Sequence, residues 1–314
     1  MLQVKKYSAA DQRQWDDFVN HSRNGTFLFL RNYMDYHSDR FHDFSLLIYK
    51  NNKLIALLPA HLDEKQLCSH LGLTYGGFVL SNKMTATLML EVFKASIDYV
   101  AAQTDVENFI YLPIPYIYAS VPSQEDLYAL FRLNAQLKAR KISSVVCLDK
   151  PLGLSELRNR KLKKAEKQGL EIIQDNDYPA FWNILENNLK IKYNAAPVHS
   201  LSEIILLHQR FPNNILLYRV CAAQETVAGC VLYLTKNVVH VQYIASTPEG
   251  RTVCAVDYLF NYLIYNKYAG KTRYFDLGTS VEEGGRVLNE GLIFQKEGFG
   301  GRAVVYDTYV LKLK

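Results

Sequence analysis

The sequence predicts an α/β protein (an α+β mixed sheet) in which two tandem domains each form a mixed, mostly antiparallel sheet flanked by helices. Three observations predict it. The 314 residues are 49% hydrophobic and 21% charged, which is typical of a folded chain long enough for two domains. One order of predicted elements occurs twice, and each copy combines a hairpin with alternating strands and helices.

The repeat begins at the two tryptophans. Trp15 and Trp182 each lie near the start of an amphipathic stretch, and they are separated by about half the chain. A strand, a turn and a second strand follow each of them, which predicts a hairpin in each half. The paired segments are residues 45–50 with 54–58 and residues 215–219 with 227–231, with the turns near Asn51-Asn52 and Gln224-Glu225.

The order of elements continues in parallel after the hairpins. Each half has a helix, a short apolar strand, a second helix and a long closing strand, in that order. In the first half they cover residues 85–100, 109–112, 124–132 and 142–148, and in the second half 255–268, 273–277, 288–297 and 304–311. A helix near 154–169 joins the halves, with Gly169 placed to end it. These patterns predict domains at 1–150 and 151–314.

Composition narrows the class of protein. A net charge of +5 is modest for this length and does not indicate a protein that coats nucleic acid along its whole length, and we expect no DNA partner. The five separated cysteines show no zinc-binding spacing, so we expect buried thiols and no metal. The longest uncharged stretch, 108–123, is short and interrupted by prolines, so we expect no membrane span. The first residues do not resemble a secretory signal, which favours a cytoplasmic protein.

The second half carries motifs that resemble a known superfamily. The strand 239–246, the following loop and the helix near Val253 are similar to the central strand, phosphate loop and helix of GNAT acyltransferases. The segments Tyr274–Ser280, Gly291–Gly300 and Arg158–Lys167 resemble the "fDfG.S", "gl..fK..FG" and "R.nirkAeK.g" segments of FemAB-type tandem GNAT transferases. The resemblance implies a tandem GNAT-like protein of the FemAB-like type.

The resemblance implies an acyl-CoA (acetyl-CoA) co-substrate. In such enzymes, backbone amides at the start of the helix hold the pyrophosphate, since free amides and the helix dipole attract anions. Here that role falls to residues at the end of the strand and in the loop, namely Ser246, Gly250, Arg251, Thr252, Val253 and Cys254. The loop departs from the usual Gln/Arg-x-x-Gly-x-Gly/Ala pattern because Gly250 is its only glycine.

Catalytic candidates follow from the same motifs. Lys296, between Phe294 and Phe299, suits a partly buried amine near a reacting carbonyl or phosphate, although a surface lysine is the alternative. Asp276 interrupts an apolar strand and is either a general base for the acceptor amine or a partner of backbone amides. Tyr243 and His199 are further candidates for proton transfer, against structural roles in packing and capping.

Basic and aromatic residues supply candidate substrate contacts. The helix near 154–169 places basic side chains on one face, which is either solvated or binds phosphates of CoA, a nucleotide-linked acceptor or tRNA. We expect the first domain to have lost donor binding and to shape the acceptor cleft with an aromatic loop. The candidates are Arg158, Arg160, Lys163, Lys164, Tyr116 and Tyr118.

Three functions remain open. The first is an N-acyltransferase that moves an acyl group from acyl-CoA to an amine on a small molecule, sugar or peptide by direct attack in a ternary complex. The second is FemAB-like transfer from aminoacyl-tRNA onto a cell-wall precursor, disfavoured because no long helical arm is evident. The third is a catalytically inactive tandem binding module.

Overall fold

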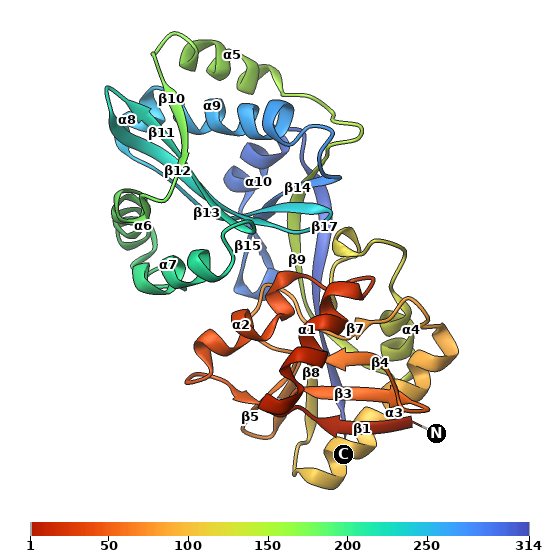
Figure 1. The fold of residues 1–314 in the computed structure, drawn as a ribbon. Coiled ribbons are helices and arrows are strands. Elements are labelled where there is room, and N and C mark those ends of the chain that lie inside the picture. Colours follow the sequence, from red (N-terminus) through yellow and green to blue (C-terminus); the bar gives the residue numbers. More distant parts are fainter. Residues whose placement is uncertain (1, 314) are drawn as a thin grey trace. The chain divides into compact units, whose positions relative to one another are not determined.

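The computed structural model describes residues 2–313 and divides the chain into two compact units (Figure 1). The first comprises Met1–Ile142, Val281–Val287 and Val305–Lys314, and the second comprises Ser143–Ser280 and Leu288–Val304. Strands β9 (Gln136–Cys147) and β17 (Arg302–Lys312) each contribute residues to both units. The compact units are therefore not the simple division at residue 150, because the end of the chain packs within the first unit.

The first unit contains a four-stranded antiparallel sheet beside a second group of strands. The sheet has the order β1-β3-β4-β7, and the second group has β17, β8, β6, β5 and β2 as successive neighbours. The hairpin between β3 and β4 turns at Asn51 and Asn52, both at positive φ (50° and 62°), as expected for a two-residue turn. The strands of the four-stranded sheet are β1 (Leu2–Lys6), β3 (Leu46–Lys50), β4 (Lys53–Leu58) and β7 (Val79–Leu80). Those of the second group, besides β17, are β8 (Asn108–Tyr111), β6 (Gln66–Cys68), β5 (His61–Asp63) and β2 (His42–Asp43).

Helices bury the apolar side chains of the first unit. Helix α3 (Ala86–Gln103) contributes Met89, Val92 and Phe93 to a core that also contains side chains of β3, β4 and β8. Trp15 of α1 (Gln12–His21) is fully buried and donates its indole N–H to the Phe29 carbonyl at 2.7 Å. This unit also contains the α-helices α2 (Arg31–Met34) and α4 (Glu125–Arg132) and several short 3-10 helices.

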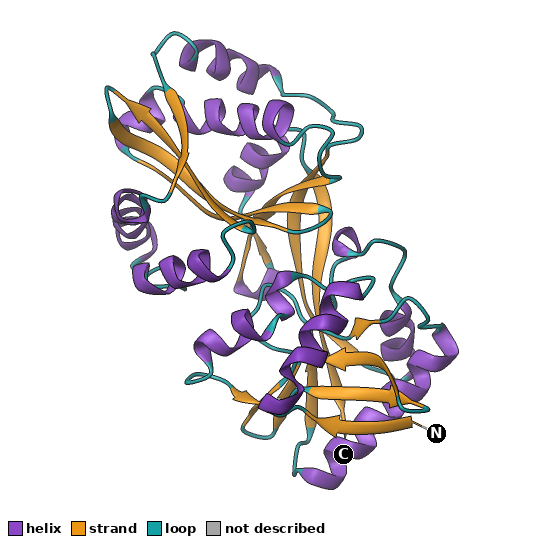
Figure 2. Cartoon of the chain, viewed as in Figure 1, coloured by secondary structure: helices purple, strands orange, loops and turns teal. Residues whose placement is uncertain are grey.

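The second unit is built on a mixed sheet of order β10-β11-β12-β13-β14-β9-β17. Its strands span Glu171–Asp175 (β10), Ile215–Ala222 (β11), Glu225–Leu234 (β12), Val238–Ser246 (β13) and Tyr274–Thr279 (β14). Neighbours from β10 to β13 are antiparallel, whereas β13 and β14 are parallel, because a helical crossover joins them. Figure 2 shows helices on both sides of these strands.

Each face of this sheet has its own helical layer. On one face, α9 (Ala255–Tyr262) and the π-helical turn Leu263–Lys267 pack on a core that includes Val239, Val241 and Phe275. On the other face, α6 (Tyr178–Tyr193) places Phe181 against β12 and Trp182 against Tyr243 of β13. The unit also contains the helices α5 (Glu156–Ala165), α7 (Leu201–Arg210), α8 (Pro248–Thr252) and α10 (Glu290–Glu297).

The fold class and the mixed sheets flanked by helices are confirmed. All five cysteines are free thiols, and Cys147 is exposed whereas the other four are buried. Within residues 2–313, no helix combines the length and apolar character needed to span a bilayer.

Candidate functional site

The site is built on two neighbouring strands that separate. Strands β13 and β14 pair only through Val238–Tyr274, Val239–Phe275 and His240–Asp276, although β13 continues to Ser246 and β14 to Thr279. A bulge at Gln242 also shifts the register between β13 and β12. A gap therefore opens in the sheet immediately beyond His240 and Asp276.

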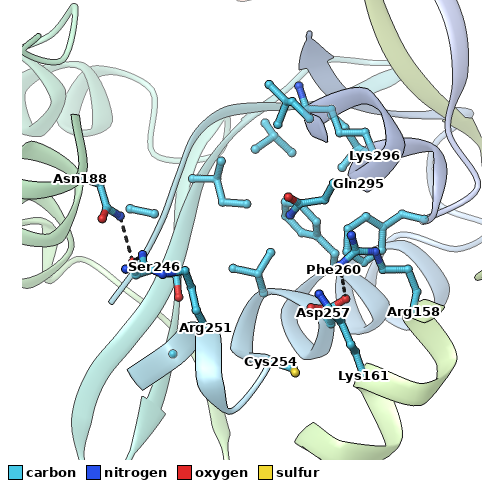
Figure 3. Close-up of a pocket in the computed structure, with 18 of the residues that line it drawn as sticks. Arg158, Lys161, Asn188, Ser246, Arg251, Cys254, Asp257, Phe260, Gln295 and Lys296 are labelled. Atoms are coloured by element: carbon cyan, nitrogen blue, oxygen red, sulfur yellow. Dashed lines mark hydrogen bonds and ion pairs between the residues drawn. The ribbon is translucent and has the colours of Figure 1, made fainter. Parts of the chain in front are cut away.

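A pocket of about 440 Å³ occupies this gap (Figure 3). Its walls come from α5, α6, β13, the segment 248–260, β14 and α10, all in the second unit. The middle of the pocket is apolar, and basic side chains lie around it. The lining residues are Arg158, Lys161, Leu185, Asn188, Leu189, Lys192, Val241, Ile244, Ala245, Ser246, Gly250, Arg251, Cys254, Val256, Asp257, Phe260, Leu277, Leu292, Gln295, Lys296 and Phe299.

The segment predicted to be a phosphate loop is a short helix, α8 (Pro248–Thr252), capped by the Thr247 hydroxyl. Backbone amides in this segment already donate hydrogen bonds within the protein. The amide of Gly250 donates to Thr247 Oγ1 and that of Arg251 to the Thr247 carbonyl, while those of Val253 and Cys254 donate to the carbonyls of Glu249 and Arg251. Among the described residues, the amides of Ala255, Val256 and Asp257 at the start of α9 have no such acceptor. Open amides thus lie about one turn later than expected.

Gly250 has a packing role in this arrangement. A Cβ on Gly250 would lie 2.1 Å from the Val227 carbonyl oxygen and 2.6 Å from Ser246 Oγ. Such distances are far below van der Waals contact, so this position accepts no side chain unless α8 moves away from β12. The glycine therefore seats α8 against the neighbouring strand.

Charged residues at the α9 end of the pocket make a mostly positive surface. Arg158 and Asp257 are both buried and form an ion pair at 2.6 Å, with the guanidinium 4.8 Å from the centre of the Phe299 ring. Arg251 donates to the Ser246 carbonyl at 2.7 Å, and the same carbonyl accepts from the Asn188 amide at 3.0 Å. Figure 3 shows the Arg158–Asp257 ion pair and the hydrogen bond between Asn188 and Ser246.

Lys296 lies on α10 at the opposite side of the pocket from Cys254 (Figure 3). Its ammonium donates to the carbonyls of Gly278 (3.0 Å) and Thr279 (2.7 Å) at the end of β14. Burial disfavours the charged form and lowers the pKa of Lys296 to about 8, against a smaller opposing effect of Asp276. Lys296 is therefore mostly protonated at neutral pH, and its pKa lies only slightly above that pH.

Asp276 is fully buried at the point where the strands part. Its carboxylate accepts from the Gly278 amide at 2.9 Å and from the Ser143 hydroxyl, and it contacts His240 Nδ1 at 2.8 Å. His240 was missed by sequence reasoning, because a single histidine in an apolar strand has no local motif. Only the parallel register, which sets His240 opposite Asp276, identifies the pair.

Tyr243 and His199 lie together, but neither lines the pocket. The Tyr243 hydroxyl contacts His199 Nδ1 at 2.5 Å and accepts from the His199 amide at 3.2 Å, and its ring packs edge-on against Trp182. Burial raises the pKa of Tyr243 to about 12. The pair fixes the start of α7 to β13.

The other predicted residues fall into separate groups. Ser246, Gly250, Arg251, Cys254 and Arg158 line the pocket with Lys296, whereas Thr252 and Val253 do not. Arg160, Lys163 and Lys164 are exposed on α5.

The two predicted tyrosines belong to the first unit and differ in exposure. The Tyr116 side chain is half exposed, whereas Tyr118 is buried and its hydroxyl contacts that of Tyr306 at 3.1 Å. Of these two, only Tyr116 presents its ring to solvent.

Separated parallel strands, a pocket in the gap and a helix that begins there define the class of fold, a GNAT-type acyltransferase fold. Residues 157–284 match the acetyltransferase (GNAT) domain family. No curated protein matches the chain in sequence. The matched residues lie almost entirely in the second unit, which is therefore similar to a GNAT domain.

Solved structures extend the comparison to the whole chain. The chain is similar to FemX (10% identity, TM-score 0.70), with 97% of this chain and 96% of that one covered. It is also similar to the C-terminal domain of a putative lysylphosphatidylglycerol synthetase from Agrobacterium fabrum (11%, TM-score 0.60, 97% and 92% covered). A tandem GNAT protein from the clavulanic acid pathway gives 11% identity and a TM-score of 0.55, with 100% and 99% covered. The chain therefore has a tandem GNAT fold of the FemAB-like type.

Proposed function

We propose that the second unit binds acyl-CoA and transfers its acyl group to an amine by direct attack in a ternary complex. The observation that carries this proposal is the gap between β13 and β14, occupied by a pocket that extends from the open amides of α9 to Lys296. A thioester is already activated, so the reaction needs a positioned donor, a base and a donor of hydrogen bonds to the carbonyl oxygen.

The pocket suits the separate parts of the donor. Ala255, Val256 and Asp257 offer amides at a helix N-terminus, where phosphate binds favourably. The lining has five basic side chains and one acidic side chain (Arg158, Lys161, Lys192, Arg251 and Lys296 against Asp257), a net charge of +4 when all are ionised. Val241, Ile244 and Leu277 provide apolar walls for the pantetheine arm and the acyl group.

Lys296 is placed to assist the reaction at the acyl end. Its ammonium is held by two carbonyls of β14 and lies in the part of the pocket where the strands separate. A buried cation near a thioester stabilises the negative charge that develops on the carbonyl oxygen. We propose this electrostatic role for Lys296.

Donor binding is tested by thermal shift with acetyl-CoA. The double variant Lys161→Met/Lys192→Met removes two positive charges from the pocket, and Lys271→Met removes one from an exposed turn elsewhere in the same unit. We expect acetyl-CoA to raise the Tm of the native protein and of Lys271→Met, and to raise that of the double variant much less. Absence of any shift for the native protein at millimolar acetyl-CoA would overturn the proposal and favour an inactive binding module.

Transfer from aminoacyl-tRNA is the second candidate, and the exposed basic face of α5 favours it. Arg160, Lys163 and Lys164 of α5 and Lys167, two residues beyond its end, have i, i+3, i+4 and i+7 spacing and are all exposed. Filter binding with total tRNA at increasing salt tests it, because phosphate contacts weaken steeply with salt. Salt-dependent binding that is lost in Lys163→Met/Lys164→Met, without protection by acetyl-CoA, would select this function over the first.

A further inference from the structure

His240, which is 12% exposed, and fully buried Asp276 form an oriented pair at the point where β13 and β14 part, next to pocket-lining Val241 and Leu277. His240 Nδ1 lies 2.8 Å from Asp276 Oδ2, and Asp276 also receives hydrogen bonds from Ser143 and the Gly278 amide. A carboxylate held by such donors remains an acceptor, so the Nδ1 of neutral His240 carries the proton. Its Nε2 then has a free lone pair and has no hydrogen-bond partner within residues 2–313.

The position of the pair coincides with the opening of the sheet. His240 and Asp276 are the last paired residues of β13 and β14, and the next residues along each strand, Val241 and Leu277, line the pocket. His240 and Asp276 are not themselves among the residues that line the pocket, so the pair lies one rung before the residues that do.

Gly278 separates His240 from Lys296 without a side chain between them. A Cβ at Gly278 would be 4.0 Å from His240 Cε1 and 3.9 Å from Lys296 Nζ, so both groups border the same small space. Gly278 has φ of +80°, a conformation that favours glycine. Glycine at this position thus places no side chain between the imidazole and the ammonium.

The face of the sheet also matters. Val239 and Val241 point into the core beneath α9, so the His240 side chain lies on the opposite face, where it is 12% exposed. A donor held by the amides of α9 and an acceptor that arrives from the opposite face would meet at this rung. His240 is accessible there, whereas fully buried Asp276 is not.

We propose that His240 is the general base of the transfer and that Asp276 is its positioning residue. The acceptor nitrogen attacks the thioester carbonyl, the new C–N bond forms, the C–S bond breaks, and CoA leaves as a thiolate. His240 Nε2 takes the proton lost by the nitrogen and passes it to the thiolate or to solvent, so the products are the amide and CoA-SH. This inference rests on the proposed function and replaces the expectation that Asp276 itself meets the acceptor.

The test uses free-thiol release from acetyl-CoA with glycinamide, ethanolamine or glucosamine as acceptor. His240→Gln is expected to lower kcat by about 10²–10⁴-fold, to remove the acidic limb of the pH profile, and to keep the acetyl-CoA thermal shift. The matched control is His208→Gln, because His208 bonds the Ile215 carbonyl outside the pocket. Activity of His240→Gln within threefold of native, with an unchanged acidic limb, would overturn the inference.

Two further outcomes distinguish failure of the acyl-transfer function from failure of the role of His240. If the native protein releases no thiol with any acceptor and shows no acetyl-CoA thermal shift, the proposed function fails, and the inference fails with it. ¹⁵N NMR of the native protein, with the His240 signal assigned by its loss in His240→Gln, reports the tautomer without catalysis. An Nδ1–H ring supports the pair, and an Nε2–H ring contradicts it.

Discussion

Replacement of Gly250 by alanine distinguishes a packing glycine from a phosphate-binding glycine. The new Cβ would lie 2.1 Å from the Val227 carbonyl oxygen, so α8 or β12 has to move. Overpacking of this kind costs about 1–3 kcal/mol, and the contact with rigid backbone places Gly250→Ala at the upper end. The gain in helix propensity offsets up to about 1 kcal/mol.

The net loss in the free energy of unfolding is therefore about 2 kcal/mol. For a unit of this size, each kcal/mol shifts Tm by about 2–4 °C, so we expect a decrease of about 4–8 °C in calorimetry. Gly291→Ala is the matched control, because Gly291 is also in the first turn of a helix and its Cβ would approach nothing closer than 3.9 Å.

The two interpretations of Gly250 predict opposite results. If Gly250 seats α8, Gly250→Ala lowers Tm and Gly291→Ala leaves Tm equal or higher. A Gly250→Ala protein with native Tm but without acetyl-CoA protection would refute the packing argument and restore the phosphate-loop interpretation.

Three other perturbations test the electrostatics. Asp257→Asn leaves the buried Arg158 guanidinium without a carboxylate and should lower the free energy of unfolding by about 3–5 kcal/mol in urea titrations; a loss below about 1 kcal/mol would contradict a buried pair. Because the pKa of Lys296 is about 8 in the folded protein, below the ordinary lysine value of 10.5, the free energy of unfolding of the native protein should rise as the pH increases from 8 to 10.5, and that of Lys296→Met should lack this rise. Equal slopes of unfolding free energy against pH for the two proteins would contradict the lowered pKa. Burial lowers the pKa of His61 from 6.5 to about 4, so the neutral imidazole stabilises the folded state fully above pH 6.5, and about 3 kcal/mol of the free energy of unfolding is lost as the pH falls to 4. The stability of His61→Gln should fall less steeply with acid, and identical acid transitions for the two proteins would contradict this.

The order of elements could be predicted because each depends on local signals. The hairpin at Asn51-Asn52 and the amphipathic helices around Trp15 and Trp182 were visible from residue type and period alone. The strand pairing could not be read in this way. The closing strand β17 was expected to complete the second domain, yet Val305–Lys314 packs in the first unit, because pairing depends on contacts between residues far apart in sequence.

The candidate site was predicted in part. Lys296, Arg251 and Arg158 came from motif resemblance and do line one pocket. His240 had no such signal, since its meaning lies in the residue opposite it on a parallel strand. The open amides were expected at 250–254 but occur at the start of α9, because Thr247 and Pro248 begin a separate short helix that no periodicity indicated.

The place of β17 in the first unit has a consequence for biosynthesis. The strand segment that pairs with β8, Tyr309–Lys312, is separated by about two hundred residues from its neighbour, Asn108–Tyr111. While the ribosome is still translating the intervening sequence, the backbone groups of β8 that face β17 are unpaired and can hydrogen-bond with other chains. Chaperone dependence of the nascent protein should therefore persist until the final strand emerges.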